Sequence, residues 1–89
     1  MVIYKYELHP YDNKQVLEVP DDFSYLKMGI QNGKVVLWAA VDPTKPTEKI
    51  GIHPVSTEEE FEWKDSWIFL DTIQHPHGLV LHYFIEYRV

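Results

Sequence analysis

The sequence predicts an all-β protein, a small antiparallel sandwich or partly open barrel of about seven strands with at most one short helical turn. Two observations predict this class. Apolar residues alternate with polar ones over several short stretches, and Gly, Pro, Asn and Asp recur between those stretches at intervals of about ten residues. The 89 residues fit a single β domain spanning residues 1–89. A domain of this size buries only about 60% of its unfolded surface, so we expect a small core.

We expect the first strand at residues 2–8, where Val2, Tyr4 and Tyr6 share one face. Turn residues 10–13 follow, and a short second strand at residues 15–19 ends at Pro20. We expect these two strands to form a hairpin with each other.

The clearest turn is Asn32-Gly33, because Asn-Gly allows positive φ at both central positions of a two-residue hairpin turn. It predicts paired strands at residues 24–31 and 34–41. A second hairpin is predicted from residues 66–74 and 79–89 around His75-Pro76-His77-Gly78. The last strand is apolar on both faces, which indicates a central strand of a two-layer structure or a face covered by a partner subunit.

Between the two hairpins, residues 42–47 contain two prolines and are expected to form an ordered turn or loop. Residues 49–56 are extended but interrupted by Gly51 and Pro54, as is typical of an edge strand. Residues 56–64 are the one helix candidate, with Ser or Thr as a cap and Glu in the first turn. Because short helices are marginal, we expect a single turn packed through Phe61 and Trp63.

Composition excludes several classes of function. The formal charge is −6, and Arg88 is the only arginine, so we expect no direct nucleic-acid partner. There is no cysteine, which excludes disulfides, thiolate metal sites and a cysteine nucleophile. No stretch has the length of a membrane span, and the first residues lack the pattern of a signal peptide. We therefore expect no membrane association and a cytoplasmic location.

Residues with catalytic chemistry are few, and each has a structural alternative. His75, His77 and His82 are close enough in sequence to suggest a metal site, but His-Pro-His-Gly is also good turn chemistry, and we favour the turn. Asp42 before Pro43 is either a catalytic carboxylate or a turn initiator, and we favour the latter. We expect no catalytic residue, metal or cofactor, and hence a protein that is not an enzyme.

Asp71 is a separate case, because the alternation of residues 66–74 places it on the face of Trp67, Phe69 and Ile73. A carboxylate among such residues needs a partner or a place in a ligand pocket. We favour structural pairing.

Two groups of residues suggest binding. The aromatic residues, 15% of the chain, exceed what a small core must bury, and rings with polar edges suit a subunit interface or a stacked base. The four carboxylates Glu58, Glu59, Glu60 and Glu62 are either a solvated face or a surface for a basic protein.

Several segments together resemble a family of small bacteriophage proteins of unknown function. They are Ile3-Tyr4-Lys5-Tyr6, Val16-Leu17-Glu18-Val19-Pro20, Gln31-Asn32-Gly33, Leu37-Trp38-Ala39 with Val41-Asp42-Pro43, Leu70-Asp71-Thr72-Ile73-Gln74 and Leu79-Val80-Leu81-His82-Tyr83-Phe84. The Leu-Trp-Ala-x-Val-Asp-Pro segment is the most specific. The family pattern has Gly-Thr-Gly-His where this chain has Val55-Ser56-Thr57-Glu58-Glu59, so a site built on that turn is altered here. The resemblance implies a phage origin and a location in the host cytoplasm, but no assigned activity.

By analogy with small phage proteins that lack catalytic signatures, the leading hypothesis is a non-enzymatic counter-defence protein. It is a homo-oligomer that sequesters a small ligand, such as a nucleotide immune signal, by stacking and by lysine contacts. Its candidate ligand-binding residues are Trp38, Asp42, Tyr4, Tyr83 and His82. The alternative is an acidic inhibitor that binds a host defence or nucleic-acid-handling protein through Glu58, Glu59, Glu60 and Glu62. A histidine-dependent metal hydrolase is the least favoured hypothesis.

Overall fold

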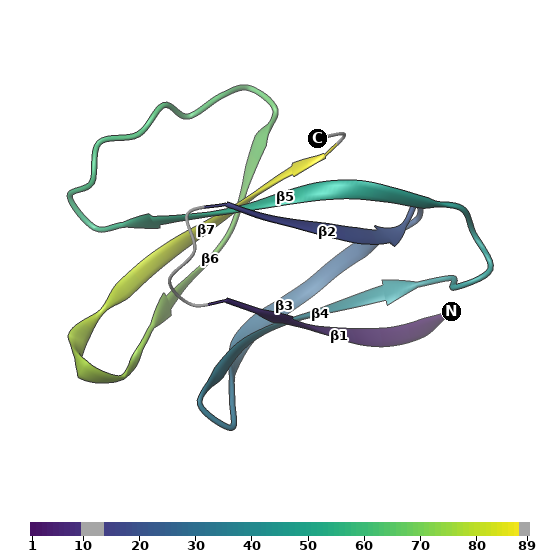
Figure 1. Ribbon diagram of the computed structural model, residues 1–89, viewed down its shortest axis with the longest axis horizontal. Coiled ribbons are helices and arrows are strands. Elements are labelled where there is room, and N and C mark those ends of the chain that lie inside the picture. Colours follow the sequence, from purple (N-terminus) through teal and green to yellow (C-terminus); the bar gives the residue numbers. More distant parts are fainter. Residues whose placement is uncertain (10–13, 88–89) are drawn as a thin grey trace.

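Seven strands form, and they assemble into two antiparallel sheets (Figure 1). The computed structural model describes residues 1–9 and 14–87, with His77 described by its backbone alone. The strands are β1 (Val2–Leu8), β2 (Gln15–Pro20), β3 (Ser24–Gln31), β4 (Lys34–Val41), β5 (Thr47–Ser56), β6 (Trp67–Gln74) and β7 (Val80–Tyr87). The all-β class predicted from the sequence is confirmed.

The first sheet has the order β1-β4-β3, and the second has the order β2-β5-β7-β6. The two predicted hairpins β3–β4 and β6–β7 are both present. At the β3–β4 turn, Asn32 has φ 53° and Gly33 has φ 77°, the positive values that the Asn-Gly pair predicts. A single 3₁₀ turn, Pro76–Gly78, lies between β6 and β7. We conclude that local turn chemistry set both hairpins.

The predicted hairpin of the first two strands is wrong. β1 pairs with β4, and β2 pairs with β5, so the two strands lie in different sheets. Each strand lies at the edge of a different sheet, a choice that sequence proximity does not reveal. The predicted turn at residues 10–13 lies outside the described residues.

The predicted edge position of residues 49–56 is also wrong, because β5 lies between β2 and β7. The register explains how a proline is tolerated there. β2 pairs with β5 only as far as Gln15 opposite Ile52, and Pro54 lies two residues further along. In that part of β5 the missing N–H of proline removes no bond to β2.

The core lies between the two sheets. Its fully buried side chains come mainly from the inner faces of β4, β5 and β7, and include Leu37, Val41, Ile50, Ile52, Tyr83 and Ile85. β7 is a central strand, as its two apolar faces suggested: Tyr83 and Ile85 face the core, and Phe84, on the opposite face, is also only 4% exposed. The outer face of β7 must therefore have its own cover.

That cover is the loop at residues 57–66, seen at the upper left in Figure 1. The expected helical turn here is wrong: no helix forms in residues 57–66, and Glu58 has φ 70°, outside the helical region. Phe61 and Trp63 both contact Phe84. Residues two apart point to nearly opposite sides of a helix but share a side of an extended chain, which favours the extended form.

Asp71 does not share a face with Trp67 and Phe69. The register of β6 shifts between Phe69 and Asp71, so Phe69 lies opposite Phe84 on the outer face, whereas Asp71 lies opposite Tyr83 on the inner one. A β-bulge reverses the alternation in this way, and the sequence pattern gave no sign of it. The Asp71 carboxylate accepts a hydrogen bond from the backbone N–H of Thr72 at 2.8 Å.

Candidate functional site: an aromatic pocket on the second sheet

The outer face of the second sheet and the loop over it enclose a pocket, which we call the outer pocket. It is lined by Val55, Ser56, Thr57, Glu58, Glu59, Phe61, Trp63, Phe69, Thr72, His82 and Phe84. Its floor comes from three neighbouring strands, because Val55 lies opposite His82 in β5–β7 and Thr72 lies opposite His82 in β6–β7. The loop supplies one wall. Three strands and a loop therefore converge on a single site.

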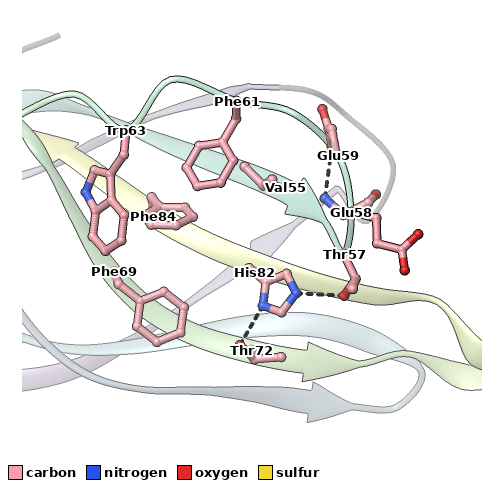
Figure 2. Close-up of a pocket in the computed structure, with 11 residues that line it drawn as sticks. Val55, Thr57, Glu58, Glu59, Phe61, Trp63, Phe69, Thr72, His82 and Phe84 are labelled. Atoms are coloured by element: carbon pink, nitrogen blue, oxygen red, sulfur yellow. Dashed lines mark hydrogen bonds between the residues drawn. The ribbon is translucent and has the colours of Figure 1, made fainter.

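Aromatic rings form one end of the outer pocket (Figure 2). The ring of Phe84 is at their centre, with centroid distances of 5.3 Å to Phe61, 5.1 Å to Trp63 and 5.5 Å to Phe69. These are favourable aromatic separations. The Trp63 indole N–H also donates a hydrogen bond to the backbone oxygen of Trp67 at 3.0 Å, which fixes the loop against β6.

Polar groups form the other end. His82 lies between two hydroxyl groups, with Nε2 2.8 Å from Oγ1 of Thr57 and Nδ1 2.8 Å from Oγ1 of Thr72 (Figure 2). A hydroxyl can donate or accept, so either neutral tautomer of the imidazole satisfies both contacts. This chain of hydrogen bonds links the loop to β6 through β7 and holds the ring of His82 in place.

Size and charge limit what the outer pocket can hold. Its volume is about 460 Å³, within the range of about 300–1,000 Å³ typical of small-molecule sites. The exposed residues Glu58 and Glu59 lie at the polar end, and Glu59 accepts a hydrogen bond from the backbone N–H of Ser56 at 2.9 Å. Carboxylates at this position favour a neutral or positively charged ligand over an anion.

A second polar contact supports the sheet beside the outer pocket. The ring of His53 stacks on Trp67 at a centroid distance of 4.0 Å, and its Nε2 is 2.9 Å from Oε1 of Glu86. The hydrogen bond with His53 lowers the pKa of the Glu86 carboxyl. These residues hold the start of β6, and so the base of the loop, against β5 and β7.

The structure does not bring the five predicted ligand-binding residues together. Only His82 lines the outer pocket. Tyr83, its neighbour in β7, is 1% exposed in the core, and burial raises the pKa of its hydroxyl to about 12. Tyr4 lies opposite Ala39 on the inner side of the first sheet and is 42% exposed.

The remaining two lie on or just after β4. Trp38 is on the outer face of the first sheet, as its register with Lys5 and Lys27 shows. Asp42 follows the end of β4, where its Oδ1 accepts hydrogen bonds from the backbone N–H and the hydroxyl of Thr44, and these bonds lower its pKa. This is the turn-forming role that we favoured for Asp42.

The histidines of the second hairpin do not form a metal site in the described part of the chain, where no group of three or more His, Cys, Asp or Glu residues lies close enough to hold an ion. His75 Nε2 lies 3.3 Å from the buried hydroxyl of Tyr83, whereas His82 is on the opposite face of the sheet. The observed contacts therefore give these two histidines separate structural roles.

The aromatic and threonine residues that line the outer pocket were not predicted as ligand-binding residues. They are Phe61, Trp63, Phe69, Phe84, Thr57 and Thr72. The sequence contains one indication of this site, because Phe84 and His82 alternate with core residues in a strand that is apolar on both faces. The site could not be predicted from alternation because a bulge in β6 places Phe69 and Asp71 on opposite faces of the sheet. Without the register, the residues opposite Phe84 could not be identified.

Fold and site together define a small two-sheet β protein with an aromatic pocket on an outer sheet face. No helix among the described residues is long and apolar enough to cross a membrane. Over residues 1–89 the chain matches the family described as a domain of unknown function (DUF7352), and it belongs to that family. Neither a curated protein nor a solved structure matches it.

Proposed function

We propose that the protein is a non-enzymatic binding protein that holds a small ligand in the outer pocket. The observation that supports this is a cavity of about 460 Å³ that combines four aromatic rings with the fixed polar groups of Thr57, Thr72 and His82. Binding sites typically combine apolar walls with a few oriented polar groups in this way. The rings supply contact area, and the polar groups supply orientation.

The ligand class follows from the lining. A flat, mainly apolar molecule fits between the rings of Phe61, Trp63 and Phe69, and a hydroxyl or amine on it can replace one of the contacts to His82. Glu58 and Glu59 favour a neutral or cationic ligand and disfavour phosphates, because no lysine or arginine lines the described pocket. Within this pocket, a nucleotide signal is therefore a poorer fit than a neutral or cationic aromatic compound.

The biological setting of this binding is part of the proposal. The resemblance to small phage proteins supports a counter-defence role in the cytoplasm of an infected host, in which the protein sequesters its ligand without turning it over. Assembly into a homo-oligomer is supported by the exposed apolar groups at the pocket, since Phe61, Trp63 and Phe69 are 44%, 60% and 46% exposed. Such side chains suit a subunit contact that closes the pocket.

A pair of fluorescent probes of opposite charge tests the proposal. Acridine orange is planar and cationic, and anilinonaphthalene sulfonate is aromatic and anionic. We expect the cation to bind and to raise the melting temperature, and the anion to bind at least about tenfold more weakly. The Phe69→Ala variant should weaken binding of the cation at least about tenfold. Leu26→Ala, at an exposed apolar residue outside the pocket, should not weaken it. Equal binding to both variants would contradict the proposed site.

A second candidate function is the binding of a basic host protein. The loop presents Glu58, Glu60 and Glu62 as exposed residues interleaved with the exposed rings of Phe61 and Trp63. Exposed aromatic residues among carboxylates suit a partner surface that is both basic and apolar. Pull-down from host lysate with the wild type and with a variant carrying Lys at positions 58, 59, 60 and 62 tests it. The wild type should retain a partner that the charge-reversed variant loses.

A further inference from the structure

The outer face of the first sheet carries a second surface, on the opposite sheet from the outer pocket. Trp38 is central on this face, because β4 is the middle strand of the sheet. Its direct neighbours across the sheet are Lys5 on β1 and Lys27 on β3. Neighbouring strands lie about 4.8 Å apart, so both lysines are within reach of the indole. A partly exposed tryptophan is thus flanked by a cation on each side.

The absence of a side chain at Gly29 leaves space for the indole of Trp38. A Cβ atom at Gly29 would lie 3.4 Å from Cζ3 and 3.7 Å from Cη2 of Trp38, so the six-membered ring of the indole lies beside the backbone of β3. Gly29 is opposite Val36, one step along the outer face from the Trp38–Lys27 pair. The ring therefore leans across the sheet toward β3 over a position without a side chain.

The charge of this face differs from that of the whole chain. At the paired positions of β1, β3 and β4 that the structure describes on this face, the charged residues are Lys5, Lys27, Lys34 and Glu7, in a chain with a formal charge of −6. Lys34 Nζ is 3.5 Å from Oε2 of Glu7, and both side chains are more than half exposed. Such surface pairs are weak, and Lys34 can exchange this partner for another anion at little cost.

The side chain of Lys5 also extends across the outer face of the first sheet. Its Nζ donates a hydrogen bond of 2.8 Å to Oε1 of Gln31, and this bond runs from β1 to β3 across β4. Val36, on the outer face of β4 beneath this span, is only 1% exposed. The ammonium group of Lys5 is therefore drawn across the middle strand toward Gln31, at the end of β3.

We propose that this surface binds a nucleotide, with the base stacked on Trp38 and the phosphates at Lys5 and Lys27. Base-on-aromatic stacking on the face of a β-sheet, with lysines at the phosphates, is an established way to hold nucleotides. A single mononucleotide is the occupant that fits, because the described outer face of this sheet offers one aromatic ring for stacking and a strand of nucleic acid needs several. This site is separate from the outer pocket and carries the opposite charge.

Isothermal titration with adenosine triphosphate tests the site, with inorganic tripolyphosphate as the probe for phosphate contacts alone. We expect the nucleotide to bind about tenfold or more tightly than tripolyphosphate, and we expect Trp38→Ala to remove that difference. Lys27→Glu should weaken the binding of both ligands and reduce the dependence of that binding on salt concentration. Since Lys27 is exposed, its substitution leaves the fold intact even if Trp38→Ala does not.

Matched controls lie elsewhere on the molecule. Ile68→Ala removes an exposed apolar side chain from β6 of the second sheet, outside the outer pocket, and Lys45→Glu makes the same charge change in the β4–β5 loop. Both should leave the affinity for the nucleotide within about twofold. Four results would overturn the proposal: no binding at millimolar nucleotide, equal binding of tripolyphosphate, equal loss in Lys45→Glu, or affinity for oligothymidylate that rises with its length.

Discussion

At the scale of single residues, His82 decides how the outer pocket is organised. Its two ring nitrogens contact Thr57 in the loop and Thr72 in β6, so one side chain joins the loop, β6 and β7. The sequence placed His82 among the candidate binding residues without indicating its partners. Those partners are hydroxyl groups, which fix the ring and leave it able to exchange a contact with a ligand.

Substitution of Thr72 tests this arrangement. Thr72→Val keeps the shape of the side chain but removes the contact to Nδ1, and we expect a loss of about 1 kcal/mol of stability. For a domain of this size that corresponds to a melting temperature lower by about 4–8 °C. Thermal unfolding followed by circular dichroism measures it. Thr47→Val, at an exposed threonine at the start of β5, is the control and should change the melting temperature far less.

His75 gives a prediction on pH. Burial lowers the pKa of His75 below its ordinary value of 6.5, so the unfolded chain takes up a proton there more readily than the folded one. The contribution of the neutral ring to stability is complete above pH 6.5 and is lost as the pH falls toward the lowered pKa. Urea unfolding between pH 7.5 and about 5 should therefore show a decline in the free energy of unfolding. His75→Gln should reduce that decline, and an unchanged slope would contradict the assignment.

At the scale of elements, the turns and the loop behave differently. The β3–β4 hairpin is determined by two adjacent residues whose positive φ values match their types. The loop at residues 57–66 is instead held by distant contacts, with Phe61 and Trp63 on Phe84 and Thr57 on His82. Local chemistry favoured a helical turn there, and tertiary packing overrode it.

The hairpin turn is tested at Gly33, which has φ 77°. Gly33→Ala places a Cβ in a left-handed conformation, and we expect a loss of about 1–2 kcal/mol. Nothing lies within 4 Å of a Cβ at this position, so the loss is one of backbone conformation and not of a steric clash. Urea denaturation provides the measurement. Asn32→Gly, which keeps a residue suited to positive φ, should cost much less; an equal cost in the two variants would refute this account of the turn.

The loop is tested at Trp63, which bonds the backbone of Trp67 and contacts Phe84. Trp63→Ala should release the loop without unfolding the sheets, because the side chain is 60% exposed and lies outside the core. Hydrogen exchange followed by mass spectrometry should show faster exchange in residues 57–66 and unchanged protection in β4 and β7. Loss of protection throughout the molecule would mean that the loop and the sheets unfold as one unit.

At the scale of the whole molecule, the two sheets divide the charge and the candidate sites between their outer faces. The second sheet carries the outer pocket with its acidic loop, and the first carries Trp38 with lysines around it. The molecule is flat, with extents of 39 × 32 × 17 Å and a radius of gyration of 13.0 Å. A compact chain of this length has a radius of gyration of about 12 Å. A flat shape leaves large faces available for partners.

Small-angle scattering tests the proposed homo-oligomer. The Cα atoms of one subunit have a radius of gyration of 13.0 Å, whereas an assembly of two or more subunits gives a distinctly larger value. We expect the larger value, together with a melting temperature that rises with protein concentration. Trp63→Asp, at an exposed ring of the proposed contact, should shift the protein toward the monomer. A radius of about 13 Å at every concentration would rule out the oligomer.

The sequence by itself determined the features that depend on neighbouring residues. Alternation set the faces of most strands, Asn32-Gly33 and the segment 75–78 set two turns, and Asp42 initiated a third. Each of these results from backbone preferences or side-chain period within a few residues, which do not depend on tertiary contacts. For this reason the all-β class and the bounds of β3 and β4 could be predicted.

Only the tertiary structure decided which strands pair and where ligands can bind. β1 pairs with β4 and not with β2, and a bulge in β6 directs Phe69 outward and Asp71 inward. Both depend on which apolar faces meet across the two sheets, and many pairings satisfy the same alternation. The outer pocket, built from β5, β6, β7 and the loop, exists only once that register is set, since its residues are separated along the chain and converge through packing alone.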